Sequence, residues 1–320
     1  MKKLISVLLT IVLIAACFAG CAQEKKPDAV RVATLMGPTG MGMAKLMDDA
    51  ANGKTEGGYE FTVASSPDQV ASDVISGSVD IAAVPVNLAS VLWNKTAGSV
   101  QVAAVNTLGV LYILENGDTI HSIADLAGKT LYATGQGATP EYVLNYLLAA
   151  NGLDPETDLT IEYLAEHTEL ATKMSAGDVV LGMLPEPNVT AVLSGNPDVR
   201  IALDLTEEWD KVSDSALIQG CIIVNKQFAE EYPGAVETFL EEYRASVDFV
   251  NENPEDASVL IEAAGIVPKA AVARKALPNC NICLITGDEM KTAVRQMLDV
   301  LYSADPKSVG GALPDEDFYR

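Results

Sequence analysis

Residues suited to ligand binding occur in two glycine-rich segments of the sequence. In the first, Gly37, Pro38, Thr39 and Gly40 follow a predicted buried strand, 30–35. Such a turn leaves backbone N–H groups free at a helix start, where they favour an anion or a polar ligand group, although a plain tight turn has the same composition. In the second, Thr134, Gly135, Gln136 and Thr139 supply hydroxyl and amide groups that form directional hydrogen bonds without charge. We expect the two segments to be opposite walls of one site, with helix capping as the alternative role for Thr139.

Two more candidate positions follow strongly apolar runs. Val86 ends the run 81–86, and Asn87, which follows it, either caps the next helix or contacts a ligand. Glu186 follows the run 179–184, and either interacts with a helix dipole or accepts a hydrogen bond from a ligand amine or amide. No Arg or Lys lies within the four candidate segments, which favours a neutral or partly cationic organic ligand.

Common nucleotide and catalytic motifs are not completed by these residues. Gly37 and Gly42 have the spacing of a phosphate-binding loop, but Met43 stands where that loop requires Lys. The dinucleotide pattern fails as well, because Lys45 replaces its third glycine. His121 and His167 belong to no recognisable nucleophile or metal motif. We therefore expect no catalytic residue and no cofactor.

Some aromatic and cysteine residues have open roles. Four aromatic side chains either stack on a ligand or pack in the core, namely Trp93, Tyr112, Tyr132 and Tyr142. Cys280 and Cys283 form half of a zinc pattern without a second half. Together with Cys221 they are expected to be buried or weakly exposed thiols, and a disulfide between Cys280 and Cys283 stays an alternative.

The order of predicted elements repeats once along the chain. A strand, a glycine turn and a helix occur at Gly37 and again at Gly135, and an apolar strand then ends at Pro85 and again at Pro185. This alternation predicts an α/β fold with two lobes of similar topology, each a mainly parallel sheet flanked by helices. Because ligands of open α/β sheets bind beyond the carboxyl ends of the strands, the four segments should face one another across an inter-lobe cleft.

The sequence also predicts the boundaries of the parts. We expect a signal peptide at 1–20, a tether at 21–28, a first lobe at 29–115 plus 216–320, and a second lobe at 116–215. Two crossovers, near residues 115 and 215, would then form a hinge between the lobes.

The N-terminus has the features of an export signal. Lys2 and Lys3 precede an apolar run, 4–16, that is too short to span a bilayer. Small residues before Cys21 resemble a lipoprotein signal, which implies lipid modification of Cys21; an ordinary secretory signal is the alternative. The formal net charge of −23 would repel nucleic acid and anionic lipid headgroups, so we expect neither as a partner.

Several short motifs together resemble a known family. They are Val79-Asp80-Ile81-Ala82, Asp125-Leu126-Ala127-Gly128-Lys129-Thr130, Pro185-Glu186-Pro187, Val224-Asn225-Lys226-Gln227-Phe228-Ala229 and Asn251-Glu252-Asn253-Pro254-Glu255. In this order they resemble the solute-binding lipoproteins of ABC importers, in the NMT1-like group that serves nitrate, sulfonates, taurine and thiamine-precursor pyrimidines.

The resemblance implies a two-lobed periplasmic-binding-protein fold of type II. It implies a lipid-anchored, extracytoplasmic, monomeric protein that captures a small organic molecule or oxyanion and delivers it to an ABC permease and its ATPase. The alternatives are an extracellular sensor domain and an enzyme on the same scaffold, similar to thiamine-pyrimidine or menaquinone-pathway enzymes. Those enzymes are cytosolic, so the export signal argues against them.

Overall fold

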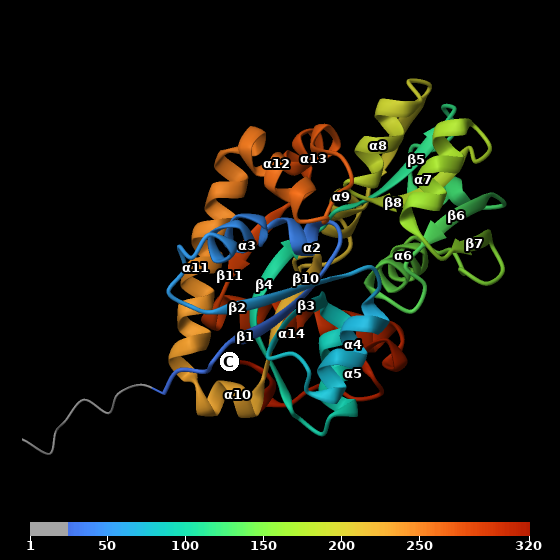
Figure 1. Ribbon diagram of the computed structural model, residues 1–320. Helices are drawn as coiled ribbons and strands as arrows, with labels where there is room; N and C mark the ends of the chain where they lie inside the picture. Colours follow the sequence, from blue (N-terminus) through green and yellow to red (C-terminus); the bar gives the residue numbers. More distant parts are fainter. Residues whose placement is uncertain (1–24) are drawn as a thin grey trace, which may run out of the picture.

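The computed structural model describes residues 25–320 and shows an α/β fold with two mixed sheets flanked by helices, which confirms the predicted fold class (Figure 1). The predicted signal peptide and Cys21 lie outside the described residues. None of the helices from Lys25 onward combines the length and apolarity that crossing a bilayer requires.

The first sheet has the strand order β11-β4-β10-β3-β1-β2. Its members are β1 (Val30–Leu35), β2 (Tyr59–Ala64), β3 (Ile81–Pro85), β4 (Val100–Leu108), β10 (Ile218–Asn225) and β11 (Ile282–Ile285). Strand β1 runs parallel to β2 and β3, whereas β10 runs antiparallel to β3 and β4.

The second sheet has the strand order β7-β6-β8-β5-β9. Its members are β5 (Leu111–Asn116), β6 (Thr130–Thr134), β7 (Thr160–Leu164), β8 (Leu181–Pro185) and β9 (Val199–Asp204). The order β7-β6-β8-β5 matches β2-β1-β3-β10 of the first sheet, and in both the last strand is antiparallel to its neighbour. The two lobes therefore share their topology, as the repeated element order predicts.

The chain passes between the sheets at two places. It leaves the first sheet after Leu108 and enters the second at Leu111, so β5 contains residues 111–115, which the sequence analysis grouped with the first lobe. A side chain at Gly109, in this crossover, would collide with the Thr206 hydroxyl, so the close approach requires glycine. The return is made before Ile218, where β10 begins.

Helices cover both faces of each sheet (Figure 1). In the first half they are α2 (Pro38–Met41), α3 (Ala44–Ala51), α4 (Pro67–Ser76), α5 (Val86–Lys95), η1 (Ile123–Leu126), α6 (Thr139–Ala150) and α7 (His167–Ala176). In the second half they are α8 (Asn188–Gly195), α9 (Leu205–Asp210), α10 (Lys226–Glu231), α11 (Pro233–Glu252), α12 (Pro254–Ala263), α13 (Ala270–Ala276), η2 (Leu277–Asn279), α14 (Gly287–Ala304), η3 (Pro306–Val309) and η4 (Glu316–Phe318).

The ends of α4 show how local sequence sets these elements. The Ser66 hydroxyl accepts a hydrogen bond from the Gln69 backbone N–H, and Pro67 occupies the first helical position. At the other end Gly77 adopts the left-handed conformation, which a glycine enters without steric cost. Ser66 and Gly77 thus set the two ends of α4.

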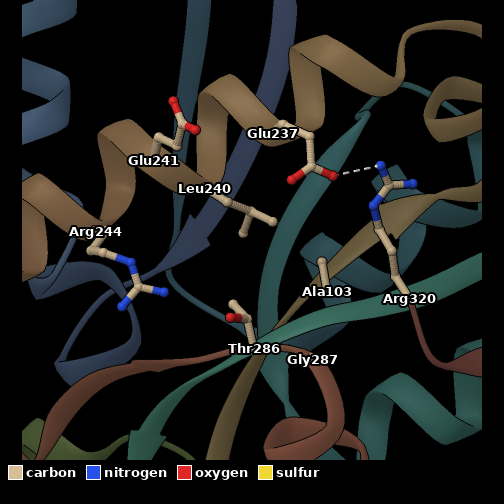
Figure 2. Close-up of a pocket in the computed structure, with 8 residues that line it drawn as sticks. All are labelled: Ala103, Glu237, Leu240, Glu241, Arg244, Thr286, Gly287 and Arg320. Atoms are coloured by element: carbon tan, nitrogen blue, oxygen red, sulfur yellow. Dashed lines mark hydrogen bonds and ion pairs between the residues drawn. The ribbon is translucent and has the colours of Figure 1, made fainter.

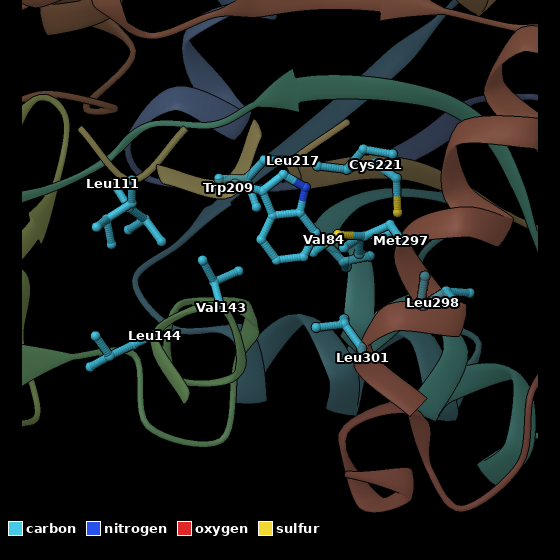
Figure 3. Packing of buried hydrophobic residues seen from close by; sticks show 14 of the residues in the cluster. Val84, Leu111, Val143, Leu144, Trp209, Leu217, Cys221, Met297, Leu298 and Leu301 are labelled. Carbon is cyan, nitrogen blue, oxygen red and sulfur yellow. The ribbon is translucent and has the colours of Figure 1, made fainter. Parts of the chain in front are cut away.

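The largest hydrophobic cluster is continuous across the two lobes. Figure 3 shows Met297 and Leu301 of the first lobe on one side of Trp209, and Val143 and Leu144 of α6 on the other. Trp209 is fully buried, and its indole N–H donates to the Ser215 carbonyl at 2.6 Å. The lobes are therefore packed together in this structure.

Candidate functional site

The four predicted segments lie at the carboxyl ends of β1, β3, β6 and β8, where the two lobes meet. Gly37, with φ of 85°, precedes α2, and a Cβ built on it would lie 4.0 Å from Cδ of Pro187 in the second lobe. Thr39 lies inside α2 and packs towards Gly220 of β10. We call these segments, residues 36–40, 85–87, 134–139 and 185–187, the interface loops.

Asn87 and Thr139 contact each other across the lobes. The Thr139 hydroxyl donates to Oδ1 of Asn87 at 3.0 Å, and both side chains are buried. Neither residue caps a helix: α5 begins at Val86 with Pro85 as its N-cap, and α6 begins at Thr139 with Ala138 as its N-cap. The capping alternatives for these two residues are therefore wrong, because Asn87 is the second and Thr139 the first residue of its helix. Each turns its side chain to the other lobe.

Glu186 is a buried carboxylate, 2% exposed, at the end of β8. It accepts hydrogen bonds from the backbone N–H of Thr190 at 3.0 Å and from the Thr190 hydroxyl at 2.9 Å, which is the predicted interaction with a helix start. Burial raises the pKa of Glu186, and the bonds from Thr190 and the nearby Asn279 amide offset only part of this. Among the described residues, no Lys, Arg or His forms a salt bridge with Glu186.

The first lobe contributes Asn279 and Cys280 beside Glu186. The charge of Glu186 adds to burial in raising the pKa of Cys280, and it acts in the same direction on the pKa of Tyr112, where burial is again the main cause. The cysteines within residues 25–320, namely Cys221, Cys280 and Cys283, are free thiols. A polar, acidic group thus lies between the lobes next to one aromatic side chain.

Thr134 forms a hydrogen bond with a residue that is not among the predicted ligand-binding residues. Its hydroxyl lies 2.6 Å from Nδ1 of His167, the first residue of α7. Burial lowers the pKa of His167 to about 4, so the ring is neutral near pH 7. His167 follows the carboxyl end of β7, where ligands of α/β sheets bind, and this position could have identified it in the sequence. In the adjoining loop Gln136 is exposed, and Glu141 accepts a hydrogen bond from the Gly137 N–H at 2.5 Å.

The remaining aromatic candidates pack in hydrophobic clusters. Trp93 meets Phe318 edge-to-face at 5.5 Å, and Tyr142 packs on the shared core. Tyr132 lies on the second-lobe core, which also contains Tyr112. Burial is the main cause of the raised pKa of Tyr112, and the charges of Asp204 and Glu186 add to it.

The NMT1/THI5-like family model matches residues 60–257 of the chain. The chain belongs to this family. The match includes both crossovers between the sheets and three of the four interface loops.

Solved structures similar to this NMT1/THI5-like protein share its fold. An ABC transporter protein from Parabacteroides distasonis is 25% identical, with a TM-score of 0.77 over 92% of this chain and 99% of that one. The periplasmic aliphatic sulphonate binding protein SsuA from Escherichia coli is 19% identical, with a TM-score of 0.72 over 89% and 91%. The periplasmic nitrate-binding protein NrtA from Synechocystis PCC 6803 is 14% identical, with a TM-score of 0.57 over 74% and 67%. No curated protein matches the sequence.

A separate hollow of about 300 Å³ lies on the first lobe of the NMT1/THI5-like protein (Figure 2). Two arginines and two glutamates line it, and Arg320 forms an ion pair with Glu237 at 3.1 Å. Glu237, Glu241 and Arg244 are exposed to solvent. None of the predicted ligand-binding residues lines this hollow.

Proposed function

We propose that this protein is an extracytoplasmic solute-binding protein that captures a small molecule between its two lobes and delivers it to an ABC permease and its ATPase. Membership of the NMT1/THI5-like family and the fold shared with ABC transporter and periplasmic binding proteins support this class of function. The proposal includes lipid anchoring through Cys21, action as a monomer and no catalytic step.

The proposed binding site consists of the interface loops. Its residues are Gly37, Pro38, Thr39, Gly40, Val86, Asn87, Thr134, Gly135, Gln136, Thr139 and Glu186. Several of them are almost inaccessible in the packed arrangement, so a solute can reach them only after the lobes separate. The crossovers at Gly109 and before Ile218 are the proposed hinge between the lobes, with residues 111–115 of β5 on the side of the second lobe.

Glu186 carries the proposal for the ligand class. A buried carboxylate without a cationic partner disfavours an oxyanion at the same place, and it is stabilised when a ligand brings a positive charge or N–H donors. We therefore favour an organic ligand with an amine, amidine or amino-heteroaromatic group over nitrate or a sulfonate.

A thermal-shift panel tests this function. Amines, aminopyrimidines and vitamins form one arm, and nitrate, taurine and alkylsulfonates form the other. A ligand at a hundred times its dissociation constant adds about 2.7 kcal/mol to the free energy of unfolding, which a melting curve resolves easily. Stabilisation by a simple oxyanion would contradict the ligand class, and turnover of a bound compound would contradict the receptor function.

Two variants connect the panel to Glu186. With a cationic hit, Glu186→Gln should weaken binding about thirtyfold, because a charge-assisted hydrogen bond is lost. Glu166→Gln is the matched control, since Glu166 is exposed at the start of α7. The affinity of this variant for the same ligand should stay within about twofold of that of the parent protein. Equal affinities for all three proteins would restrict Glu186 to its contact with the helix start.

A further inference from the structure

Helix α5 holds the C-terminal part of the chain with three polar side chains on one face. The hydroxyl of Ser90 donates to the Val309 carbonyl at 2.8 Å, and the Asn94 amide donates to the same carbonyl at 2.9 Å. Asn94 also reaches the Ala312 carbonyl at 2.8 Å. Asn87, one turn earlier, donates to the Ser308 carbonyl at 3.2 Å. We call residues 305–320 the C-terminal strap.

The strap is seated along the first lobe beyond α5 as well. Phe318 is fully buried and packs edge-to-face on Trp93 of α5. The Gln101 amide donates to the Asp317 carbonyl at 2.8 Å, and the backbone N–H of Arg320 donates to the Val102 carbonyl at 3.0 Å. The position of the strap is therefore determined by the first lobe at several points.

Asn87 connects the strap to the second lobe through hydrogen bonds on both sides of its amide. Its Nδ2 faces the Ser308 carbonyl, which can only accept a hydrogen bond, so its Oδ1 must face the Thr139 hydroxyl. Asn87, Thr139 and Ser308 are 2%, 0% and 1% exposed. A missing partner would leave a buried polar group unsatisfied, which is costly, so this arrangement is specific to closed lobes with a seated strap.

We propose that the Asn87–Thr139 hydrogen bond holds the two lobes together and that the C-terminal strap positions Asn87 for it. Asn87 is then a positioning residue for lobe closure, and Thr139 is its partner on α6. Since α5 also packs against α6, the bond lies where the two helices start side by side. The proposal concerns closure itself and does not depend on which solute binds.

Closure is measured without a solute by two methods, one suited to mostly open molecules and the other to mostly closed molecules. Cysteines introduced at Lys275 and Ser194, whose Nζ and Oγ atoms lie 3.5 Å apart across the lobes, are joined by a short bis-maleimide. The rate of joining follows the closed fraction when open molecules dominate. Hydrogen exchange of residues 86–95 and 139–150 follows the open fraction when closed molecules dominate. Single-cysteine variants correct for reaction at Cys283, which is partly exposed.

Thr139→Val removes the donor and keeps the side-chain shape. It should lower the ratio of closed to open molecules about tenfold, seen as slower cross-linking or faster exchange. Thr139→Ser keeps the hydroxyl and should restore the ratio to within about twofold. Circular dichroism shows whether each variant is folded. If Thr139→Val does not fold, Thr139→Ala is used in its place with the same expected result. A folded variant that has the closed-to-open ratio of the parent protein would refute the role of this bond.

Two neighbouring glycines provide a matched test of the strap. Gly310 and Gly311 both have positive φ, of 87° and 93°, so an alanine at either costs similar backbone strain. A Cβ at Gly310 would lie 3.1 Å from Cα of Val91 and from Nδ2 of Asn94, whereas a Cβ at Gly311 meets nothing within 4 Å. Gly310→Ala therefore pushes the strap from α5, and Gly311→Ala does not.

Gly310→Ala should lower the closed-to-open ratio by several fold, and Gly311→Ala should leave it at the value of the parent protein. The double variant Gly310→Ala/Thr139→Val should open no further than Thr139→Val alone, because both changes act through one bond. Equal ratios for the two glycine variants, or full additivity in the double variant, would show that the strap does not position Asn87. A negative result in these tests would refute the role of the strap or of the bond in closure, but it would not change the expected result of the thermal-shift panel. The two proposals can therefore fail separately.

Discussion

The paired strands β5 and β8 have a buried carboxylate at each end, and the two carboxylates have opposite surroundings. At the end away from the first lobe, Glu115 of β5 pairs with Leu181. At the lobe interface, Leu111 pairs with Pro185, and Glu186 follows directly. Glu115 is 5% exposed, so both carboxylates are removed from water to a similar degree.

Glu115 is fully satisfied by its own lobe. Arg200 lies 2.8 Å from Glu115, and the backbone N–H and the hydroxyl of Thr119 donate to it. Burial acts to raise the pKa of Glu115, but the bonds from Thr119 and Ile120 and the charge of Arg200 outweigh it and lower that pKa. At the interface the pKa shifts of Glu186 and His167 both favour the uncharged form. The charge of Glu115 is therefore balanced by groups of the fold itself. The carboxylate of Glu186 would instead be stabilised by a positive charge or N–H donors from a ligand.

Removing the Arg200 cation beside Glu115 should have the largest effect on stability. Arg200→Met leaves the Glu115 charge buried without its partner, and frees the Gly117 and Ile120 carbonyls that Arg200 also binds. We expect the free energy of unfolding to fall by about 3 kcal/mol. Denaturant titration followed by circular dichroism measures the change.

The control for Arg200 is an exposed pair of the same lobe. Lys173 lies 3.8 Å from Glu169 on α7, and both side chains are largely solvated. Lys173→Met should change the free energy of unfolding by less than about 0.5 kcal/mol. If Arg200→Met and Lys173→Met lowered the free energy of unfolding by similar amounts, the buried pair of Arg200 and Glu115 would be no more important for stability than an exposed pair.

His167 should make the protein acid-sensitive. Its folded-state pKa of about 4 lies below the ordinary value of 6.5, so the unfolded chain binds a proton first as the pH falls. The stability that the neutral ring provides is present above pH 6.5 and is lost as the pH falls towards 4. Between pH 7 and pH 5 the loss should be about 2 kcal/mol. His167→Gln should abolish this part of the pH dependence, measured as melting temperature against pH.

The sequence contains a matched control for that experiment. His121, the other histidine, has a side chain that is 63% exposed and lies 3.7 Å from Asp118. His121→Gln should retain the acid sensitivity of the parent protein. Loss of the pH dependence in the His121 variant, or its persistence in the His167 variant, would show that His167 is not the group that titrates.

The features that sequence patterns predicted correctly are local. Strand β1 occupies the predicted segment 30–35, and strands β3 and β8 end at Pro85 and Pro185 as predicted. Apolar runs, caps and turn glycines act within a few residues, so they are visible in one sequence. The repeated order of such signals then predicted two lobes of one topology.

Features that depend on contacts between distant residues were not visible. Nothing near Asn87 indicates Thr139 as its partner, and nothing near Thr134 indicates His167. The sheet that receives β5 could not be predicted either, because an apolar strand fits both sheets and Gly109 marks the crossover only through its contact with Thr206. Which predicted residues contact a solute stays a prediction.

The smallest expected effect compares the same substitution at the two ends of the strand pair. Glu186→Gln removes a charge that burial disfavours, while its carbonyl still accepts from the Thr190 N–H and its new amide donates to the Thr190 hydroxyl. Without ligand, the free energy of unfolding should rise by about 1 kcal/mol. Glu115→Gln should lower it, because the charge there is matched by Arg200.

The opposite signs make this pair the sharpest test of the contrast, since size and hydrogen-bonding capacity change equally in the two variants. Denaturant titrations of both proteins at pH 7, without ligand, measure the signs directly. A loss of stability in both would mean that Glu186 is satisfied within the fold as Glu115 is, and that no ligand cation is needed to explain it. A gain at Glu186 together with weaker binding of a cationic solute would mean that the protein accepts a cost in stability to retain a carboxylate for its ligand.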